Sequence, residues 1–134
     1  MQQPEANRIN IEQSDDLVRA RSRVRDVAVE MGFNHTDQVR LVTAVSELAR
    51  NIVRYGETGF MEIMKIADNE RRGLRVRFED SGQGIADIEL AMTDGYTTGR
   101  GLGKGLPGAR RLVDDFEIRS EIGIGTIVVI TKWL

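Results

Sequence analysis

The feature that most constrains the fold of this chain is a glycine-rich stretch at residues 95–108, GYTTGRGLGKGLPG. Six of the 14 glycines of the chain fall within it. Neither a helix nor a strand tolerates that density, because each glycine costs conformational entropy and has no side chain to pack. The stretch is therefore predicted to be a loop, and the core must be built from the segments on either side of it.

The chemistry of this loop indicates an anionic ligand. Its backbone N–H groups can approach a ligand closely, and two threonines, Arg100 and Lys104 add further donors. From Leu106 onward apolar residues return at helical spacing, so the loop leads into a helix N-terminus, where backbone amides and the helix dipole favour negative charge. We interpret residues 95–105 as a lid over phosphate groups. The alternative is a solvent-exposed flexible loop without a ligand.

Two familiar phosphate-binding loops do not fit this stretch. A Walker A loop needs Gly, four residues, then Gly-Lys followed by Ser or Thr; here Thr98 stands at the first glycine and Gly105 follows the lysine. The spacing Gly103-x-Gly105-x-x-Gly108 matches the dinucleotide-binding motif. That motif must follow a strand directly, however, and residues 92–100 are polar and interrupted by glycine.

The composition excludes several classes of function. A chain of 134 residues fits a single domain, 1–134, and a net charge of −2 with a pI near 5.5 gives no electrostatic footprint for nucleic acid. The absence of cysteine excludes disulfides and thiolate chemistry. The longest apolar run, residues 122–130, is too short to span a membrane, and the N-terminus lacks the pattern of a signal peptide. We expect one cytoplasmic domain with neither a nucleic-acid nor a membrane partner.

Hydrophobic periodicity predicts the remaining elements. Expected strands cover residues 8–12, 60–67, 74–78, 116–120 and 126–133, and expected helices cover residues 14–31, 36–55 and 106–113. Ser14 and Thr36 are the expected N-caps of the first two helices. Because most strands follow one another directly, the order predicts an α+β two-layer sandwich: a mixed, mostly antiparallel sheet with the helices on one face.

Asp80 is the most informative single position. Strand alternation groups it with the apolar residues of 74–78, on the side expected to be buried. A carboxylate there is costly unless it accepts hydrogen bonds, and an adenine exocyclic amine, a ring N–H or a bound water could donate one. Gly82 and Gly84 would let the backbone turn close to a flat ligand. The alternative is that Asp80 begins an Asx-turn that ends the strand.

Glu47 and Asn51 are the candidate residues of the second helix. They are four residues apart, so they lie one turn apart on the same face and off the apolar stripe. Asn51 offers a neutral oxygen to Mg²⁺, a hard cation that prefers oxygen ligands, and Glu47 is then placed to accept a proton as a general base. The alternative is a solvated, salt-bridged helix face that also includes Arg50 and Arg54.

Taken in order, these motifs resemble those of the GHKL ATPases, the Bergerat-fold superfamily of gyrase, Hsp90, histidine kinases and MutL. The matching segments are Glu47-x-x-x-Asn51, Asp80-x-Gly82-x-Gly84, the lid at 95–105 and Gly123-Ile-Gly125-Thr126. The segments 44–52, 94–98 and 101–108 are further similar to the stressosome switch kinases of the RsbT type, whose relatives are the anti-sigma-factor serine kinases. This resemblance covers nearly the whole chain.

The resemblance implies a Bergerat fold with ATP and Mg²⁺ as cofactors. It implies that Asp80 binds the adenine amine with support from Thr126, that Gly82 and Gly84 shape the pocket, and that Asn51 ligates Mg²⁺ between the phosphates. Each of these roles is carried over from the family to the matching position of this sequence.

For catalysis, the resemblance implies that Glu47 is the base that acts on a substrate serine or threonine hydroxyl. The lid residues that it implies in nucleotide binding are Thr98, Arg100, Gly101, Leu102, Gly103, Lys104 and Gly105. Two points stay open at this stage. The lid repeats Gly-x-Gly, so the phosphate-binding register is ambiguous, and either Arg100 or Lys104 could meet the γ-phosphate.

The function that the resemblance implies is an ATP-dependent protein serine/threonine kinase. Its phosphoacceptors would be STAS-domain scaffold or antagonist proteins of a stressosome, and phosphorylation would release the kinase to activate a downstream regulator such as a phosphatase. One alternative is an anti-sigma factor that sequesters a sigma subunit and phosphorylates its antagonist. Another is a nucleotide-dependent interaction module without transferase activity. Histidine-kinase function is not expected, because no phosphoacceptor-histidine domain is present.

Overall fold

The computed structural model describes residues 7–55, 58–85, 88, 92 and 106–134. The elements are β1 (Arg8–Ile11), α1 (Ser14–Met31), α2 (His35–Tyr55), β2 (Gly59–Asp68), β3 (Arg71–Asp80), α4 (Leu106–Arg111), β4 (Asp115–Glu121) and β5 (Gly125–Trp133). Every strand and helix predicted from periodicity is found within a few residues of its expected bounds. The lid predicted at 95–105 lies outside the described residues.

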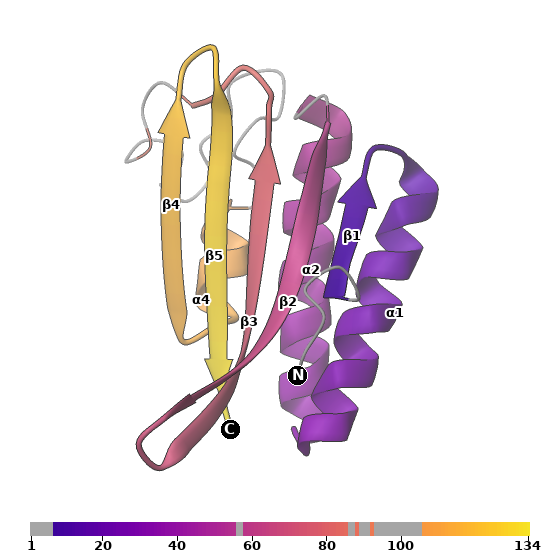
Figure 1. The fold of residues 1–134 in the computed structure, drawn as a ribbon, viewed down its shortest axis with the longest axis vertical. Helices are drawn as coiled ribbons and strands as arrows, with labels where there is room; N and C mark the ends of the chain where they lie inside the picture. The colour runs from indigo at the N-terminus through magenta and orange to yellow at the C-terminus, as the bar shows by residue number, and fades with distance from the viewer. Residues whose placement is uncertain (1–6, 56–57, 86–87, 89–91, 93–105) are drawn as a thin grey trace.

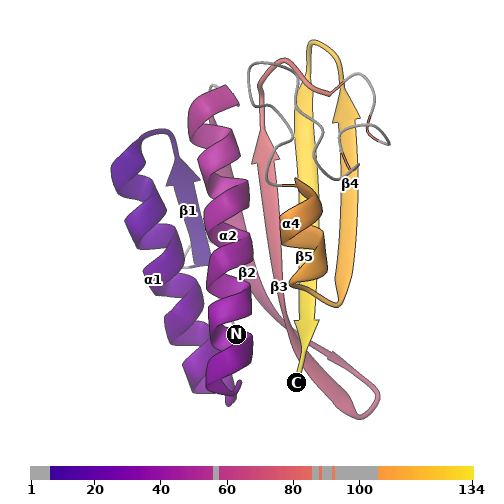
Figure 2. The same cartoon turned by 180° about the vertical axis from the view of Figure 1, so that it is seen from behind.

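The five strands form one sheet in the order β1-β2-β3-β5-β4. Figure 1 and Figure 2 show α1, α2 and α4 together on one face of this sheet. The predicted two-layer α+β sandwich is therefore confirmed. The expectation of a mixed sheet is wrong for the described strands, since all four strand pairs are antiparallel. The last strand, β5, enters beside β3 in the opposite direction, so no parallel pair arises.

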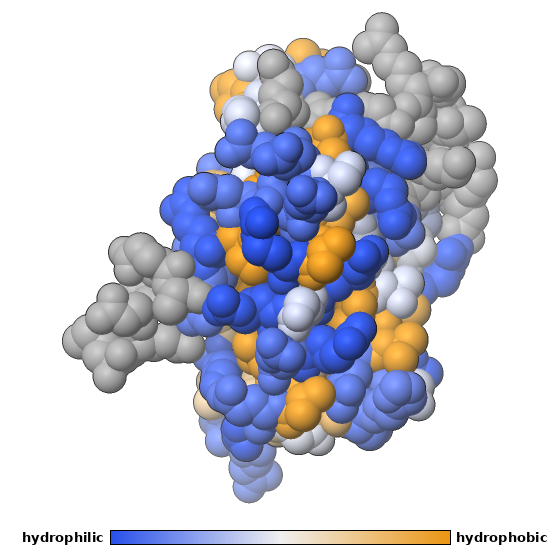
Figure 3. Space-filling model, turned by 90° about the vertical axis from the view of Figure 1, so that its right-hand side faces the viewer, coloured by the Kyte–Doolittle hydropathy of each residue, from blue (hydrophilic) through white to orange (hydrophobic). Residues whose placement is uncertain are grey.

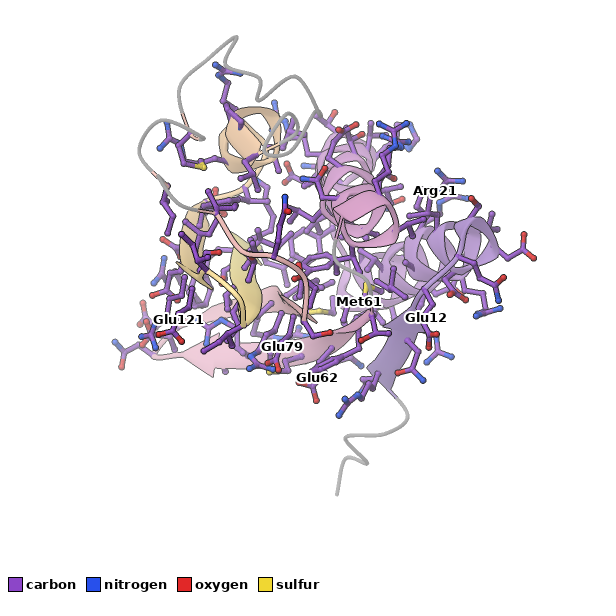
Figure 4. All side chains as sticks on the ribbon, turned by 90° about the horizontal axis from the view of Figure 1, so that it is seen from above. Glu12, Arg21, Met61, Glu62, Glu79 and Glu121 are labelled. Atoms are coloured by element: carbon purple, nitrogen blue, oxygen red, sulfur yellow. The ribbon has the colours of Figure 1, made fainter. Side chains whose placement is uncertain are left out.

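The core lies between the helices and one face of the sheet. The apolar stripes of α1 and α2 pack on the inward side chains of β2, β3 and β5. The fully buried members include Val24, Leu41, Val45, Met61, Leu74, Val76 and Ile130. Figure 4 shows the alternation on β2: Met61 points toward the helices and Glu62 points away from them. The same alternation places Leu74, Val76, Phe78 and Asp80 on the inward side of β3, as the sequence predicted.

The N-terminus of α1 differs from the prediction. Ser14 is the first helical residue rather than the cap. The buried carboxylate of Asp16 accepts hydrogen bonds from the backbone N–H groups of Glu12 and Gln13, at 2.9 and 3.1 Å. Both bonds go to the same oxygen, Oδ2, and they join the end of β1 to the first turn of the helix.

The predicted cap of α2, Thr36, is also wrong. The helix begins at His35, and the side-chain oxygen of Asn34 accepts a hydrogen bond from the N–H of Asp37 at 2.8 Å. Asn34 therefore caps the helix. Asparagine and threonine are both good N-caps, so residue type alone could not decide between neighbouring candidates.

The β2–β3 hairpin is longer than predicted. The expected strands 60–67 and 74–78 leave residues 68–73 between them as the turn, but only Asn69 and Glu70 form it, while Arg71 and Gly73 pair with Asp68 and Ile66. This end of the hairpin extends beyond the helix layer (Figure 1), so its side chains are polar although its backbone is a strand.

The side of the molecule formed mainly by α1 shows no extended apolar patch among its described residues (Figure 3). Val18 and Val29 of α1 are more than half exposed, but the hydrophobic areas on the side formed mainly by α1 are small and separated by hydrophilic residues (Figure 3). Of the helices that the structure describes, none has the combination of length and apolar character that crossing a membrane requires.

Candidate functional site

Four of the residues singled out in the sequence gather around one cavity. Asn51 on α2, Asp80 at the end of β3, Gly84 in the following turn and Thr126 on β5 all line it, and most of the remaining wall is apolar. The cavity measures about 40 Å³, which is room for a few water molecules and too little for a purine. A nucleotide base could enter only if part of the wall moved.

Asp80 is the half-buried acid of this cavity. Burial raises the pKa of its carboxyl group above the ordinary 3.8, while hydrogen bonds from the backbone of Gly82 and Thr126 act in the opposite direction and the charge of Glu79 raises it further. The Gly82 N–H donates to Oδ1 at 2.9 Å, so the Asx-turn considered as an alternative is present. A carboxylate has about four acceptor sites, and these two bonds leave capacity for a ligand.

The turn after β3 is held against the β4–β5 hairpin. The N–H of Gly123 donates to the carbonyl of Gln83 at 3.0 Å. Gly84, the next residue after Gln83, has a φ of +81°. A Cβ at this position would lie 2.4 Å from the carbonyl oxygen of Glu121. Only glycine fits there, because the turn lies directly on the hairpin backbone. Gly82 is buried beside Asp80 but does not line the cavity.

Asn51 is half-buried at the cavity wall. Its amide oxygen is a neutral ligand of the type that Mg²⁺ accepts, which is the role predicted for it. Within the described ranges no group of three or more acidic or histidine side chains could hold a metal by itself. A magnesium site here would need oxygen ligands from the nucleotide in addition to Asn51.

Glu47 lies one turn before Asn51 and outside the cavity lining. Its Oε1 accepts a hydrogen bond from Nη1 of Arg50 at 2.9 Å. Both side chains are slightly more than one-third exposed. This ion pair is part of the salt-bridged helix face that the sequence left open as an alternative. The pairing holds the carboxylate at the surface of α2 and does not by itself assign it a chemical role.

The predicted lid residues Thr98, Arg100, Gly101, Leu102, Gly103, Lys104 and Gly105 lie outside the described residues. The described chain resumes with α4, whose first residue, Leu106, lines the cavity. The predicted lid therefore joins directly onto the cavity wall along the chain.

A second, larger hollow of about 640 Å³ opens where the strands end. Figure 4 looks down on this end of the sheet, with Glu79 and Glu121 labelled. Its volume falls in the usual range of about 300–1,000 Å³ for small-molecule pockets, but only Asp80 and Thr126 of the predicted residues line it. We favour the smaller cavity as the candidate site, because Asn51 and Gly84 contribute there as well.

Sequence reasoning missed Ser120, whose hydroxyl contacts both the turn after β3 and Thr126. A signal for it was available. In the alternating strand Phe116-Glu-Ile118-Arg-Ser120, the serine falls on the same side as the two apolar residues. This is the parity argument that selected Asp80, applied to another strand.

The chain is similar in sequence to known proteins. Residues 36–134 match the family model described as histidine kinase-, DNA gyrase B-, and HSP90-like ATPase. The chain is 49% identical to serine/threonine-protein kinase RsbT of Bacillus subtilis (strain 168), over 89% of this chain and 90% of the relative. It is 30% identical to an anti-sigma F factor of Thermoanaerobacter sp. (strain X514), over 86% and 83% of the two chains.

Two solved structures share the fold. The RsbU and RsbW domains of Rv1364c from Mycobacterium tuberculosis align with a TM-score of 0.64 at 22% identity, over 93% of this chain and 32% of that one, so this chain spans about a third of it. The catalytic domain of the histidine kinase ThkA aligns with a TM-score of 0.54 at 14% identity, over 90% and 91%. The chain belongs to the family of histidine kinase-, DNA gyrase B- and HSP90-like ATPases, and within it is a homologue of serine/threonine-protein kinase RsbT.

Proposed function

We propose that the chain is an ATP-dependent protein serine/threonine kinase. It phosphorylates STAS-domain scaffold or antagonist proteins and then changes partner to activate a downstream regulator, such as a phosphatase. The observation that carries this proposal is the convergence of Asn51, Asp80, Gly84 and Thr126 on one cavity from three separate segments of the chain. The kinase name of the 49% identical relative supports the reaction class.

In this proposal part of the cavity wall moves and the enlarged cavity takes the adenine. Asp80 accepts a hydrogen bond from the exocyclic amine, and burial makes that bond stronger than it would be in water. Gly82 and Gly84 keep side chains out of the turn, and Thr126 supports Asp80 from the neighbouring strand, where the two residues are directly paired.

The phosphates would extend from the cavity toward Asn51 and the lid. Magnesium, when bound, supplies positive charge that neutralises the phosphates, with Asn51 among its ligands. The lid residues Thr98, Arg100, Gly101, Leu102, Gly103, Lys104 and Gly105 would enclose the phosphate groups. In such transfers positioning and charge neutralisation supply most of the rate enhancement.

Glu47 is the proposed base for the acceptor hydroxyl. It lies at the surface on the same face of α2 as Asn51, where a protein substrate can reach it. Arg50 holds its carboxylate by an ion pair at 2.9 Å, which orients the group before it accepts the proton of the serine or threonine.

A second candidate is an anti-sigma factor with serine kinase activity, favoured by the 30% identical anti-sigma F factor. The nucleotide site would be the same and the partners would differ. Retention of a sigma subunit in the presence of ATP would support this candidate, whereas phosphorylation of a STAS-domain protein without sigma binding would support the first.

The experiment that tests the proposal is calorimetric titration of ATP with Mg²⁺ into the wild type, Asp80→Asn and Asp68→Asn. Asp68 is an exposed hairpin carboxylate paired with Arg71 at 3.2 Å, far along β2 from the cavity, so its variant controls for loss of a charge. We expect Asp80→Asn alone to lose binding. A folded wild type that fails to bind ATP would leave an interaction module without nucleotide chemistry.

A further inference from the structure

Ser120 is a hydrogen-bonding centre directly behind the candidate site. Strand pairing sets it in a row with two residues of the cavity: Asp80 pairs with Thr126, and Thr126 pairs with Ser120, across β3, β5 and β4. All three side chains lie on the inward side of the sheet. Ser120 is half-buried and is not part of the cavity wall.

The first contact of Ser120 is with the turn after β3. Its Oγ accepts a hydrogen bond from the backbone N–H of Ile85 at 2.6 Å, across a sequence separation of 35 residues. Ile85 follows Gly84 and lines the cavity. Together with the bond from Gly123 to Gln83, this contact fastens both sides of Gly84 to the β4–β5 hairpin.

The second contact of Ser120 is with Thr126. The two hydroxyl oxygens are 2.8 Å apart, and the Ser120 Oγ is also 3.2 Å from the carbonyl oxygen of Gly125. A serine hydroxyl has one proton and two lone pairs. The Ile85 N–H occupies one lone pair, so the remaining lone pair and the proton are shared between Thr126 and Gly125.

The direction of the hydrogen bond between Ser120 and Thr126 decides whether the Thr126 hydroxyl can donate a hydrogen bond to a ligand in the cavity or can only accept one. If Ser120 donates to the Gly125 carbonyl, Thr126 donates to Ser120 and presents only lone pairs to a ligand. If Ser120 donates to Thr126, the Thr126 hydroxyl keeps its own proton for the ligand. In both cases Ser120 removes the free rotation of the Thr126 hydroxyl, which would otherwise adapt to any base edge.

We propose that Ser120 is a positioning residue that makes the site select a purine carrying a 6-amino group. It acts through Thr126, whose hydroxyl it orients beside Asp80, and through Ile85, which holds the turn against the base. The inference rests on the proposed nucleotide site. This selection uses the arrangement in which Ser120 donates to Thr126, so that the Thr126 hydroxyl can donate to the ring nitrogen N1 of adenine while Asp80 accepts from the 6-amino group. Hypoxanthine presents an N1–H to Thr126 and a 6-oxo acceptor to the Asp80 carboxylate, so neither contact is matched.

The test is to measure the dissociation constants of ATP and inosine triphosphate for the wild type, Ser120→Ala and Ser120→Thr by calorimetry. The wild type should bind ATP more tightly than inosine triphosphate. Ser120→Ala leaves the Ile85 N–H without its acceptor and should weaken ATP binding about tenfold or more, while inosine triphosphate changes little, so the preference collapses. Ser120→Thr keeps the hydroxyl and should restore the preference.

A matched control is Thr131→Val, which removes a buried hydroxyl that accepts a hydrogen bond from Arg75 on β3, away from the cavity. It should leave the ratio of the two constants unchanged. If Ser120→Ala does not fold, Thr126→Val removes the oriented hydroxyl while keeping the Ser120–Ile85 bond, and it should also abolish the preference.

The outcomes separate the two levels of inference. If Ser120→Ala lowers the affinities for ATP and inosine triphosphate by the same factor, or changes neither affinity, Ser120 has only a general structural role and the inference is overturned. The proposed function would stand in that case, since the wild type binds ATP. If the folded wild type binds neither nucleotide, the proposed site fails and the role of Ser120 fails with it.

Discussion

Replacing Gly84 by alanine gives a sharp test of how the turn after β3 meets the hairpin. Gly84 has a φ of +81°, and Gly123 in the hairpin has a φ of +82°. Alanine pays nearly the same backbone strain at both positions, roughly 1–2 kcal/mol, and gains about the same from the reduced entropy of the unfolded chain. The two positions differ in their surroundings, since a Cβ on Gly123 meets nothing within 4 Å.

At Gly84 the added carbon would lie 2.4 Å from the carbonyl oxygen of Glu121 and 3.1 Å from the Cα of Ile122. Both are backbone atoms, so no side chain can rotate away and the turn must separate from the hairpin. That movement breaks the hydrogen bond from Gly123 to Gln83, worth about 1 kcal/mol, and strains the bond from Ile85 to Ser120. We expect Gly84→Ala to cost about 1–3 kcal/mol more than Gly123→Ala.

Thermal unfolding of the two variants measures this difference. For a chain of this length 1 kcal/mol corresponds to about 3–5 °C, so a difference of about 1–3 kcal/mol should make Gly84→Ala melt roughly 3–15 °C below Gly123→Ala. Nucleotide affinity should follow the same order, because only Gly84 lines the cavity. Equal melting temperatures for the two variants would refute the close contact and, with it, the idea that the turn is clamped to the hairpin.

Three further predictions concern the proposed roles of single side chains. Glu47→Gln should retain ATP binding and lose transfer to a protein acceptor in a phosphorylation assay; surviving transfer would remove Glu47 as the base. Asn51→Ala should abolish the Mg²⁺ dependence of nucleotide affinity, measured by titration with and without the ion, and an unaltered dependence would exclude Asn51 from the metal. The raised pKa of Asp80 means that the folded state keeps this proton to higher pH than the unfolded state, so the wild type should lose stability relative to Asp80→Asn as pH rises from about the ordinary value of 3.8. Denaturation of both proteins across this range checks the sign, and a wild type that gains stability there would contradict it.

The sequence predicted most of the fold because local patterns dominate this chain. Alternation in 74–78 and helical spacing in α1 and α2 depend only on neighbouring residues, and burial followed both patterns. Asp80 could be selected for the same reason, since a polar residue on an apolar face stands out in sequence.

The features that sequence missed depend on contacts between distant segments. That β5 lies between β3 and β4 is a tertiary fact, and it is this arrangement that brings Ser120 within reach of Ile85. The prediction of the N-cap of α2 was wrong for a different reason. Asn34 and Thr36 are both residue types that cap helices well, and the path of the chain before the helix decides which of them does so. For Glu47 the sequence offered two roles, a general base or a member of a salt-bridged helix face. Residue type alone could not decide between them, and the ion pair with Arg50 is seen only in the structure.

The cavity wall comes from α2, from the turn after β3 and from β5, so no contiguous fragment of the chain contains the site. A nucleotide that binds there recognises only the fully folded chain and is thermodynamically coupled to its folding equilibrium. At a free concentration one hundred times its dissociation constant, such a ligand adds about 2.7 kcal/mol to stability. If ATP is that ligand, a fall in free ATP would lower the stability of the folded chain together with the occupancy of the site.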